Sequence, residues 1–269
     1  MYSLPTEPGS IGHTLDAGFK LYFVSFKQVL VLTMLAALSV SVPVVALVLA
    51  IPIFFTGDAA PGDATIAAFI IGFVSIMILY MWFYLAVLCR IGGIAYAQNL
   101  STGACMSTAL RKIIPVVLAT ILFSLAVMGG FLLLIIPGLI LWVSMIFYSL
   151  CIVLEGDGIL ESLRHSHRLV WGNWWRTSVI GTVVIVVYYV IYLAIQVPFV
   201  VVDQMVFDSE LGAAPGLGQA MLSTVGDIIA MVITLPLMTS VMVAVFHDLK
   251  LRKEGQDLEA RVEALTASA

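Results

Sequence analysis

The strongest candidates for chemistry are four polar side chains in the second half of the chain: Tyr188, Tyr192, Gln196 and Asp227. The first three follow one another at four-residue steps, so a helix would place them on one face. Asp227 lies in or beside a long apolar stretch, where an ionisable side chain is costly and usually functional. Two interpretations stay open: Asp227 and this stripe line a path through the membrane, or the last span begins near Ile228 and Asp227 is interfacial.

Other chemical candidates are weaker. His165, His167 and Cys151 could suggest a metal, but two residues two positions apart on a helix point to different faces. The sequence has no nucleophile elbow, phosphate-binding glycine loop or zinc-binding helix motif. We therefore predict no catalytic residue, no metal site and no cofactor. Five acidic residues between apolar runs could gather a cation or a headgroup, although they equally satisfy the orientation rule for membrane proteins: Asp58, Asp63, Asp203, Asp208 and Glu210.

Composition sets the class of protein that must position these residues. The chain is 62% hydrophobic and 10% charged, with a mean hydropathy of +1.12, far above a soluble domain. The apolar runs are continuous, as helices require, whereas a transmembrane barrel would show alternation. The net charge of −4 gives no indication of nucleic-acid binding. The sequence predicts an all-α polytopic membrane protein.

Charged residues divide the chain into apolar runs of spanning length, since about 20 residues cross the hydrocarbon core. The run from Lys112 to Glu155 carries no charge and is too long for one span. It predicts a hairpin, with its turn at Pro137-Gly138 or at Gly129-Gly130. We expect six spans, near residues 29–55, 64–90, 113–134, 139–154, 177–202 and 219–246.

The basic residues predict the orientation. With six spans, all twelve Lys and Arg residues fall on one side, which the positive-inside rule assigns to the cytoplasm together with both termini. Cys89, Cys105 and Cys151 map to the same side, so no disulfide framework is expected. The sequence therefore predicts a transmembrane domain over residues 1–249 and a cytoplasmic amphipathic tail over residues 250–269.

Three amphipathic segments precede spans, near residues 10–26, 104–112 and 157–172. Each is expected to lie in the interfacial plane as an elbow helix, with its apolar face toward the bilayer. The series suggests three elbow-plus-hairpin repeats, although interfacial anchors in any polytopic protein would explain it equally. Seven basic residues are predicted to contact anionic headgroups of the inner leaflet: Lys20, Lys27, Arg111, Lys112, Arg164, Arg168 and Arg176.

Two stretches carry a family resemblance: "PGLILWVSMIFYSLCIVLEGDGILESLRHSHRLVWGN" and the tail "FHDLKLRKEGQDLEARV". They resemble the YciC-like bacterial inner-membrane proteins, which are related to the membrane domain of some glycerophosphodiester phosphodiesterases. The resemblance covers the N-terminal elbow, the second half and the tail. It implies a six-helix domain of the bacterial inner membrane with a poorly defined role. The soluble catalytic domain of the phosphodiesterases is absent from this sequence, which argues against hydrolase activity.

Three functions remain open at this point. We favour a non-enzymatic protein that binds or organises membrane lipid or supports a membrane complex. The second is a transporter or lipid translocator with a site near Asp227, and the third is a headgroup enzyme that uses the outer carboxylates. A cavity that reaches Asp227 would favour transport, whereas a tightly packed interior would favour the first function. Phospholipids are the expected partners, and a protein partner or a homo-oligomer stays open.

Overall fold

The computed structural model describes residues 4–55, 62–98, 100–207 and 216–267. These residues form helices and no strands, and six helices are long and apolar enough to cross a membrane. The all-α polytopic fold is thereby confirmed. The helices are α1 (Ile11–Phe55), α2 (Asp63–Ala95), α3 (Thr102–Leu133), α4 (Ile135–Met145), α5 (Tyr148–Leu150), the π-helix η1 (Cys151–Glu155), α6 (Ile159–Val170), α7 (Trp174–Phe207) and α8 (Leu217–Ala267).

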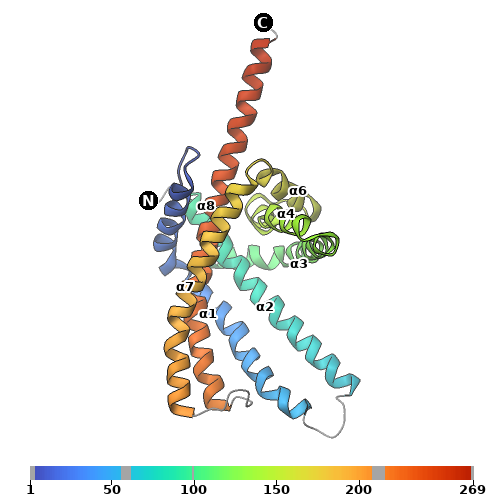
Figure 1. Cartoon of the computed structure of the whole chain (residues 1–269), viewed down its shortest axis with the longest axis vertical. Coiled ribbons are helices and arrows are strands. Elements are labelled where there is room, and N and C mark those ends of the chain that lie inside the picture. The colour runs from blue at the N-terminus through green and yellow to red at the C-terminus, as the bar shows by residue number, and fades with distance from the viewer. Residues whose placement is uncertain (1–3, 56–61, 99, 208–215, 268–269) are drawn as a thin grey trace.

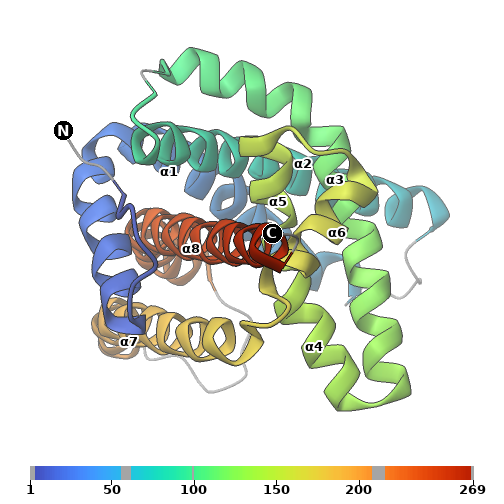
Figure 2. The same ribbon diagram turned by 90° about the horizontal axis from the view of Figure 1, so that it is seen from above.

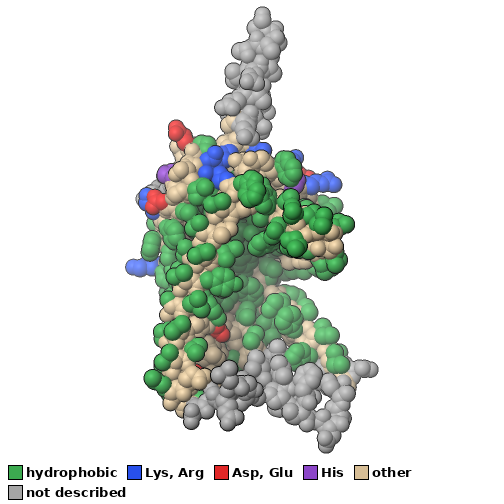
Figure 3. Space-filling model, in the orientation of Figure 1, with side chains coloured by type: hydrophobic (Ala, Val, Ile, Leu, Met, Phe, Trp, Pro, Cys, Tyr) green, Lys and Arg blue, Asp and Glu red, His purple; other side chains and the backbone are tan. Residues whose placement is uncertain are grey.

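Helix α8 is the centre of the molecule, packed against α1, α7 and α2. At one end it continues beyond the other helices as a single rod (Figure 1). Lys and Arg side chains gather around the base of this rod (Figure 3), and we call this the basic end. Toward the opposite end, the pair α1 and α2 diverges from the pair α7 and α8 (Figure 1), and we call this the open end.

The hairpin of α3 and α4 runs across the other long helices. Figure 1 shows α4 and the later part of α3 nearly end-on while α7 and α8 run along the page, and Figure 2 shows the α3–α4 hairpin side-on. The turn is neither of the two predicted sites but the single residue Leu134, whose φ of −165° and ψ of 154° are extended. Gly130 and Gly138 instead face each other across the hairpin, because a Cβ on Gly130 would lie only 2.9 Å from the Gly138 Cα. The absence of side chains at these two glycines lets the α3 and α4 backbones approach closely. The glycines at the two predicted turn sites therefore lie inside helices and serve helix packing instead. Pro137 is tolerated because it lies in the first turn of α4.

The three predicted elbows take two forms. The segment near 157–172 contains the separate helix α6, bounded by Gly156 at φ +82° and Gly172 at φ +93°. Left-handed backbone of this kind favours glycine, and the two residues set the bends on either side of α6. The segments near 10–26 and 104–112 are instead the opening turns of the continuous helices α1 and α3.

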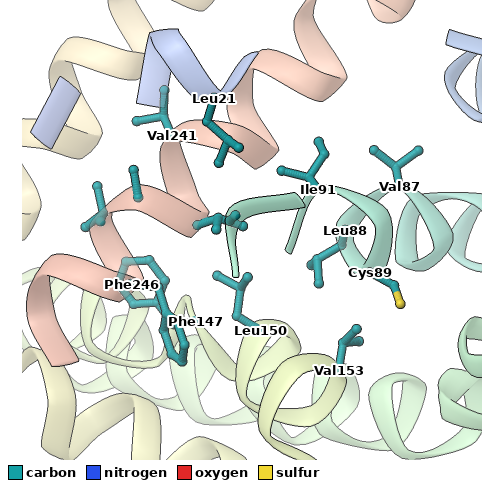
Figure 4. Packing of buried hydrophobic residues seen from close by; sticks show 14 of the residues in the cluster. Leu21, Val87, Leu88, Cys89, Ile91, Phe147, Leu150, Val153, Val241 and Phe246 are labelled. Carbon is teal, nitrogen blue, oxygen red and sulfur yellow. The ribbon is translucent and has the colours of Figure 1, made fainter. Parts of the chain in front are cut away.

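The half of the bundle toward the basic end is tightly packed. Side chains from four elements meet there with almost no exposure, including Leu21, Ile91, Leu150 and Phe246 (Figure 4). The Phe147 and Phe246 rings lie 6.1 Å apart between centroids. This packing closes the interior beneath the diverging helices of the open end.

Candidate functional site

Helices α7 and α8 bring together the four residues singled out from the sequence. Gln196 Nε2 donates to Asp227 Oδ1 and, at 3.2 Å, to the Tyr192 hydroxyl. The Tyr192 hydroxyl in turn donates to the same Asp227 oxygen at 3.5 Å. The Tyr188 and Tyr192 rings stack, with centroids 6.0 Å apart and planes inclined by 15°. We call these four residues the polar cluster.

A glycine beside Asp227 allows the two helices to meet at the polar cluster. A Cβ on Gly226 would lie 2.5 Å from Gln196 Oε1 and 3.1 Å from the Phe199 ring. Any larger residue would therefore push α7 away from α8 or displace Gln196. The close approach lets the short Asp227 side chain reach the amide of Gln196 on the neighbouring helix.

A cavity of about 530 Å³ lies against the polar cluster, and we call it the open-end cavity. Its walls come from α1, α2, α7 and α8, and Tyr80 of α2 joins Tyr188 and Tyr192 in lining it. Along α8 the lining changes from polar to apolar side chains. Ser223, Thr224 and Asp227 come first, and Ala230, Met231, Leu235 and Met238 follow. Thr234 interrupts the apolar part, but its hydroxyl donates to the Ala230 carbonyl at 2.8 Å. The open-end cavity is thus polar at its outer part and apolar at its floor.

The helix geometry gives the distance between Asp227 and the basic end. It precedes Asp248 by twenty-one residues on the continuous helix α8, a separation of about 31 Å at 1.5 Å per residue. Asp248 belongs to the charged groups of the basic end. The hydrocarbon core of a bilayer is about 30 Å thick, so Asp227 and the basic end are separated by nearly one core thickness.

The basic residues predicted to contact headgroups differ in their surroundings. Lys20, Lys27, Arg111, Arg164 and Arg168 are exposed, and Lys112 is half-buried. Two of the exposed side chains have local partners, Lys20 with Asp16 at 2.7 Å and Arg168 with Glu161 at 2.7 Å. Arg176 differs from the others, because its side chain is only 18% exposed and pairs with Asp248.

Asp248 is the centre of a network of ion pairs and hydrogen bonds that we did not predict from the sequence. Its side chain is 8% exposed and accepts hydrogen bonds from Arg176, from Arg252 at 3.0 Å and from the Gly9 amide at 3.0 Å. Both arginines also donate to the Gly9 carbonyl, and Arg176 donates to the Thr14 hydroxyl. The only part of this network that the local sequence could have indicated is the ion pair of Asp248 with Arg252, because residues four apart on a helix lie side by side. The network fastens the N-terminal segment to α7 and α8.

A second charged group surrounds η1. Ligand atoms of Cys151, Asp157 and His165 lie within 4.8 Å of one another. The set considered from the sequence was Cys151, His165 and His167, so the structure has Asp157 in the place of His167. His165 Nδ1 is 2.6 Å from Asp157 and 3.5 Å from Glu155. Lys250 already holds Glu155 at 2.5 Å. The arrangement could accept a metal ion, but Lys250 already supplies a cation beside it, and the contacts join α6, η1 and α8.

The acidic residues of the open end form no site in the described part of the chain. Asp203 accepts a hydrogen bond from Gln219 at 2.8 Å, which joins α7 to α8. Asp58, Asp208 and Glu210 lie outside the described residues, as does the side chain of Asp63. The headgroup enzyme considered from the sequence stays a prediction, because most of its carboxylates lie outside the described residues.

Comparisons with known proteins identify a family and nothing more specific. No curated protein and no solved structure matches the chain. The sequence profile of a domain of unknown function (DUF7847) matches residues 61–249. The match takes in α2 to α7 and α8 as far as Leu249, and thus the polar cluster, Arg176 and Asp248. Because it covers more than two-thirds of the chain, the protein belongs to the DUF7847 family.

Proposed function

We propose that this protein is a non-enzymatic integral membrane protein that binds bilayer lipid in the open-end cavity. The main support for this proposal is the cavity itself. Its volume of about 530 Å³ lies within the ~300–1,000 Å³ typical of ligand sites. Its polar outer part and apolar floor match the two ends of a lipid molecule. A lipid headgroup would lie near Asp227 and Ser223, with acyl chain toward Leu235 and Met238.

A second cavity supports the same proposal. It measures about 310 Å³, lies between α4, α7 and α8, and is lined almost entirely by apolar side chains such as Trp142, Ile146 and Met242. Such a space suits an acyl chain better than a polar solute, because its lining offers a polar solute few hydrogen-bond partners. The crosswise hairpin forms one of its walls.

The exposed cations at the basic end support contacts with anionic headgroups on the other face of the bilayer. Lys27, Arg111 and Arg164 are exposed and form no ion pair with the described residues. Each basic residue near an anionic membrane surface contributes about 1 kcal/mol of attraction. In this proposal the basic end faces the cytoplasm, and lipid is bound at both faces.

Filling the open-end cavity should remove its lipid. We expect Ser223→Trp, which places an indole in the cavity, to lower the amount of phospholipid that stays bound through purification by at least about half. The measurement is native mass spectrometry of the protein released from gentle detergent. Val225→Trp is the matched control, because Val225 is exposed on the same helix and does not line the cavity. Equal lipid in both variants would refute binding in this cavity.

A lipid translocator is the second candidate. The open-end cavity reaches Asp227, which is the outcome expected for a transporter, and one side chain favours this candidate further. Met238 lines both the open-end cavity and the apolar cavity beside α4. Methionine is flexible enough to move between packings, so a lipid chain could pass from one cavity to the other at this position. The packed core of the basic end argues against a wide aqueous path.

The translocator predicts lipid scrambling that depends on Met238. In liposomes with fluorescent phospholipid in one leaflet, the wild-type protein should exchange lipid faster than protein-free liposomes do. Met238→Trp should slow this exchange by about tenfold if the indole closes the junction, a barrier change of ~1.4 kcal/mol. Met221→Trp, at an exposed position on the same helix, should leave the rate unchanged. Wild-type rates equal to those of empty liposomes would discard this candidate while leaving lipid binding untouched.

A further inference from the structure

The open-end cavity contains one carboxyl side chain, and that side chain has no cationic partner among the described residues. Asp227 is the one charged residue in its described lining, which includes no Lys, Arg or His. Asp248 and Glu155, by contrast, have cationic partners. The nearest cationic layer along α8 is that of the basic end, about 31 Å away. A carboxylate so placed attracts a positive group from outside the chain.

One oxygen of this carboxylate is available to a ligand. Gln196 and Tyr192 both donate to Asp227 Oδ1. Oδ2 accepts no hydrogen bond from the described residues, and Asp227 is exposed to the cavity. The two donors orient the carboxylate while leaving its second oxygen unused.

Aromatic rings accompany the carboxylate. Tyr80, Tyr188 and Tyr192 all line the cavity, and the last two stack in parallel. The faces of tyrosine rings attract organic cations, and clusters of such rings recognise ammonium groups. A bare divalent metal ion fits this wall poorly, because Ca²⁺ and Mg²⁺ take six or more oxygen ligands and only one carboxylate is offered.

From these observations we infer that the open-end cavity selects ligands with an organic ammonium group, which binds against Asp227 and the adjoining tyrosine rings. This inference rests on the lipid binding proposed above and names the headgroup class. Zwitterionic lipids with an ethanolamine or choline headgroup carry such a group, whereas phosphatidylglycerol carries the same phosphate without it. The position of Asp227 near the far face of the core places the ammonium at headgroup depth.

The test compares headgroups on the full-length protein. Native mass spectrometry would measure binding of phosphatidylethanolamine, phosphatidylcholine and phosphatidylglycerol with identical acyl chains. We expect the wild-type protein to bind the two ammonium lipids about tenfold more tightly than phosphatidylglycerol. Asp227→Asn keeps an oxygen acceptor for Gln196 and removes the charge, so the preference should fall to within about twofold.

Two controls separate charge from structure. Asp203→Asn alters a carboxylate that also pairs with a glutamine between α7 and α8 but does not line the cavity, and it should keep the preference. Tyr188→Leu should reduce the preference by removing a ring, whereas Tyr188→Phe should retain it. Competition by tetramethylammonium chloride, set against sodium chloride, tells whether a free ammonium ion suffices or the whole lipid is required, and either result keeps the ammonium class.

Three outcomes would overturn the inference in distinguishable ways. If the wild-type protein binds phosphatidylglycerol as tightly as phosphatidylethanolamine, the headgroup class is wrong and lipid binding stands. If Asp227→Asn lowers thermal stability and loses all three lipids together while Asp203→Asn does neither, Asp227 only joins α7 to α8. If the wild-type protein retains no lipid, the proposed function itself fails.

Discussion

Replacing Asp248 with alanine should lower the free energy of unfolding by about 3–5 kcal/mol, the range for breaking a buried ion pair by removing one partner. Asp248 is 8% exposed and serves two arginines and the Gly9 amide. Its loss would leave Arg176 and Arg252 as like charges in a poorly hydrated place. It would also release the N-terminal segment, since both arginines lose the partner that orients them toward Gly9.

Thermal and denaturant unfolding in a single detergent would measure this effect. The matched control is Glu161→Ala, which removes the partner of Arg168 from a pair whose side chains are 52% and 68% exposed. A surface pair of this kind contributes at most about 1 kcal/mol. The Asp248 network would lose its assigned role if both variants unfolded at the same denaturant concentration.

Replacing Phe246 with alanine should cost about 3 kcal/mol, the lower end of the range for this truncation in soluble proteins. The side chain has no exposure and packs against Phe147 at the centre of the basic end (Figure 4). In a bilayer the transfer contribution shrinks because lipid is also apolar, but the void left in the core keeps its cost. Loss of stability should accompany unchanged insertion into the membrane.

Phe23→Ala provides the comparison, because Phe23 is 74% exposed on α1. Surrounding acyl chains can fill the space that a truncated surface side chain leaves, so we expect a change within about 0.5 kcal/mol. Steric trapping or reversible unfolding in mixed micelles would measure both variants. Equal losses at the two positions would show that the packing around Phe246 carries no special stability.

The length and hydropathy of the continuous apolar runs predicted the helical class and the positions of the long helices, since both depend on local sequence. The same is true of the stripe Tyr188, Tyr192 and Gln196, because a four-residue step fixes one helix face. Hydropathy does not fix the direction of a helix, which packing sets. The crosswise course of α3 and α4 therefore could not be read from the sequence.

Contacts between segments that are distant in the chain also could not be predicted from the sequence. Arg176 was assigned to lipid headgroups from its charge, but its partner Asp248 lies 72 residues away. The turn at Leu134 was also unpredictable, because Gly130 and Gly138 serve helix contact as readily as chain reversal. The open-end cavity depends on four helices and has no local signature beyond Asp227.

The Asp248 network has a consequence for how the protein is made. Its hydrogen bonds join Gly9 to residues 239 and 243 positions later in the chain. Helix α1 therefore leaves the ribosome long before α8, the helix that packs against its Gly18 face, exists. Until synthesis is nearly complete, this face of α1 must contact lipid or an insertion factor instead of α8. The helix bundle therefore closes late, after the helices have inserted into the membrane.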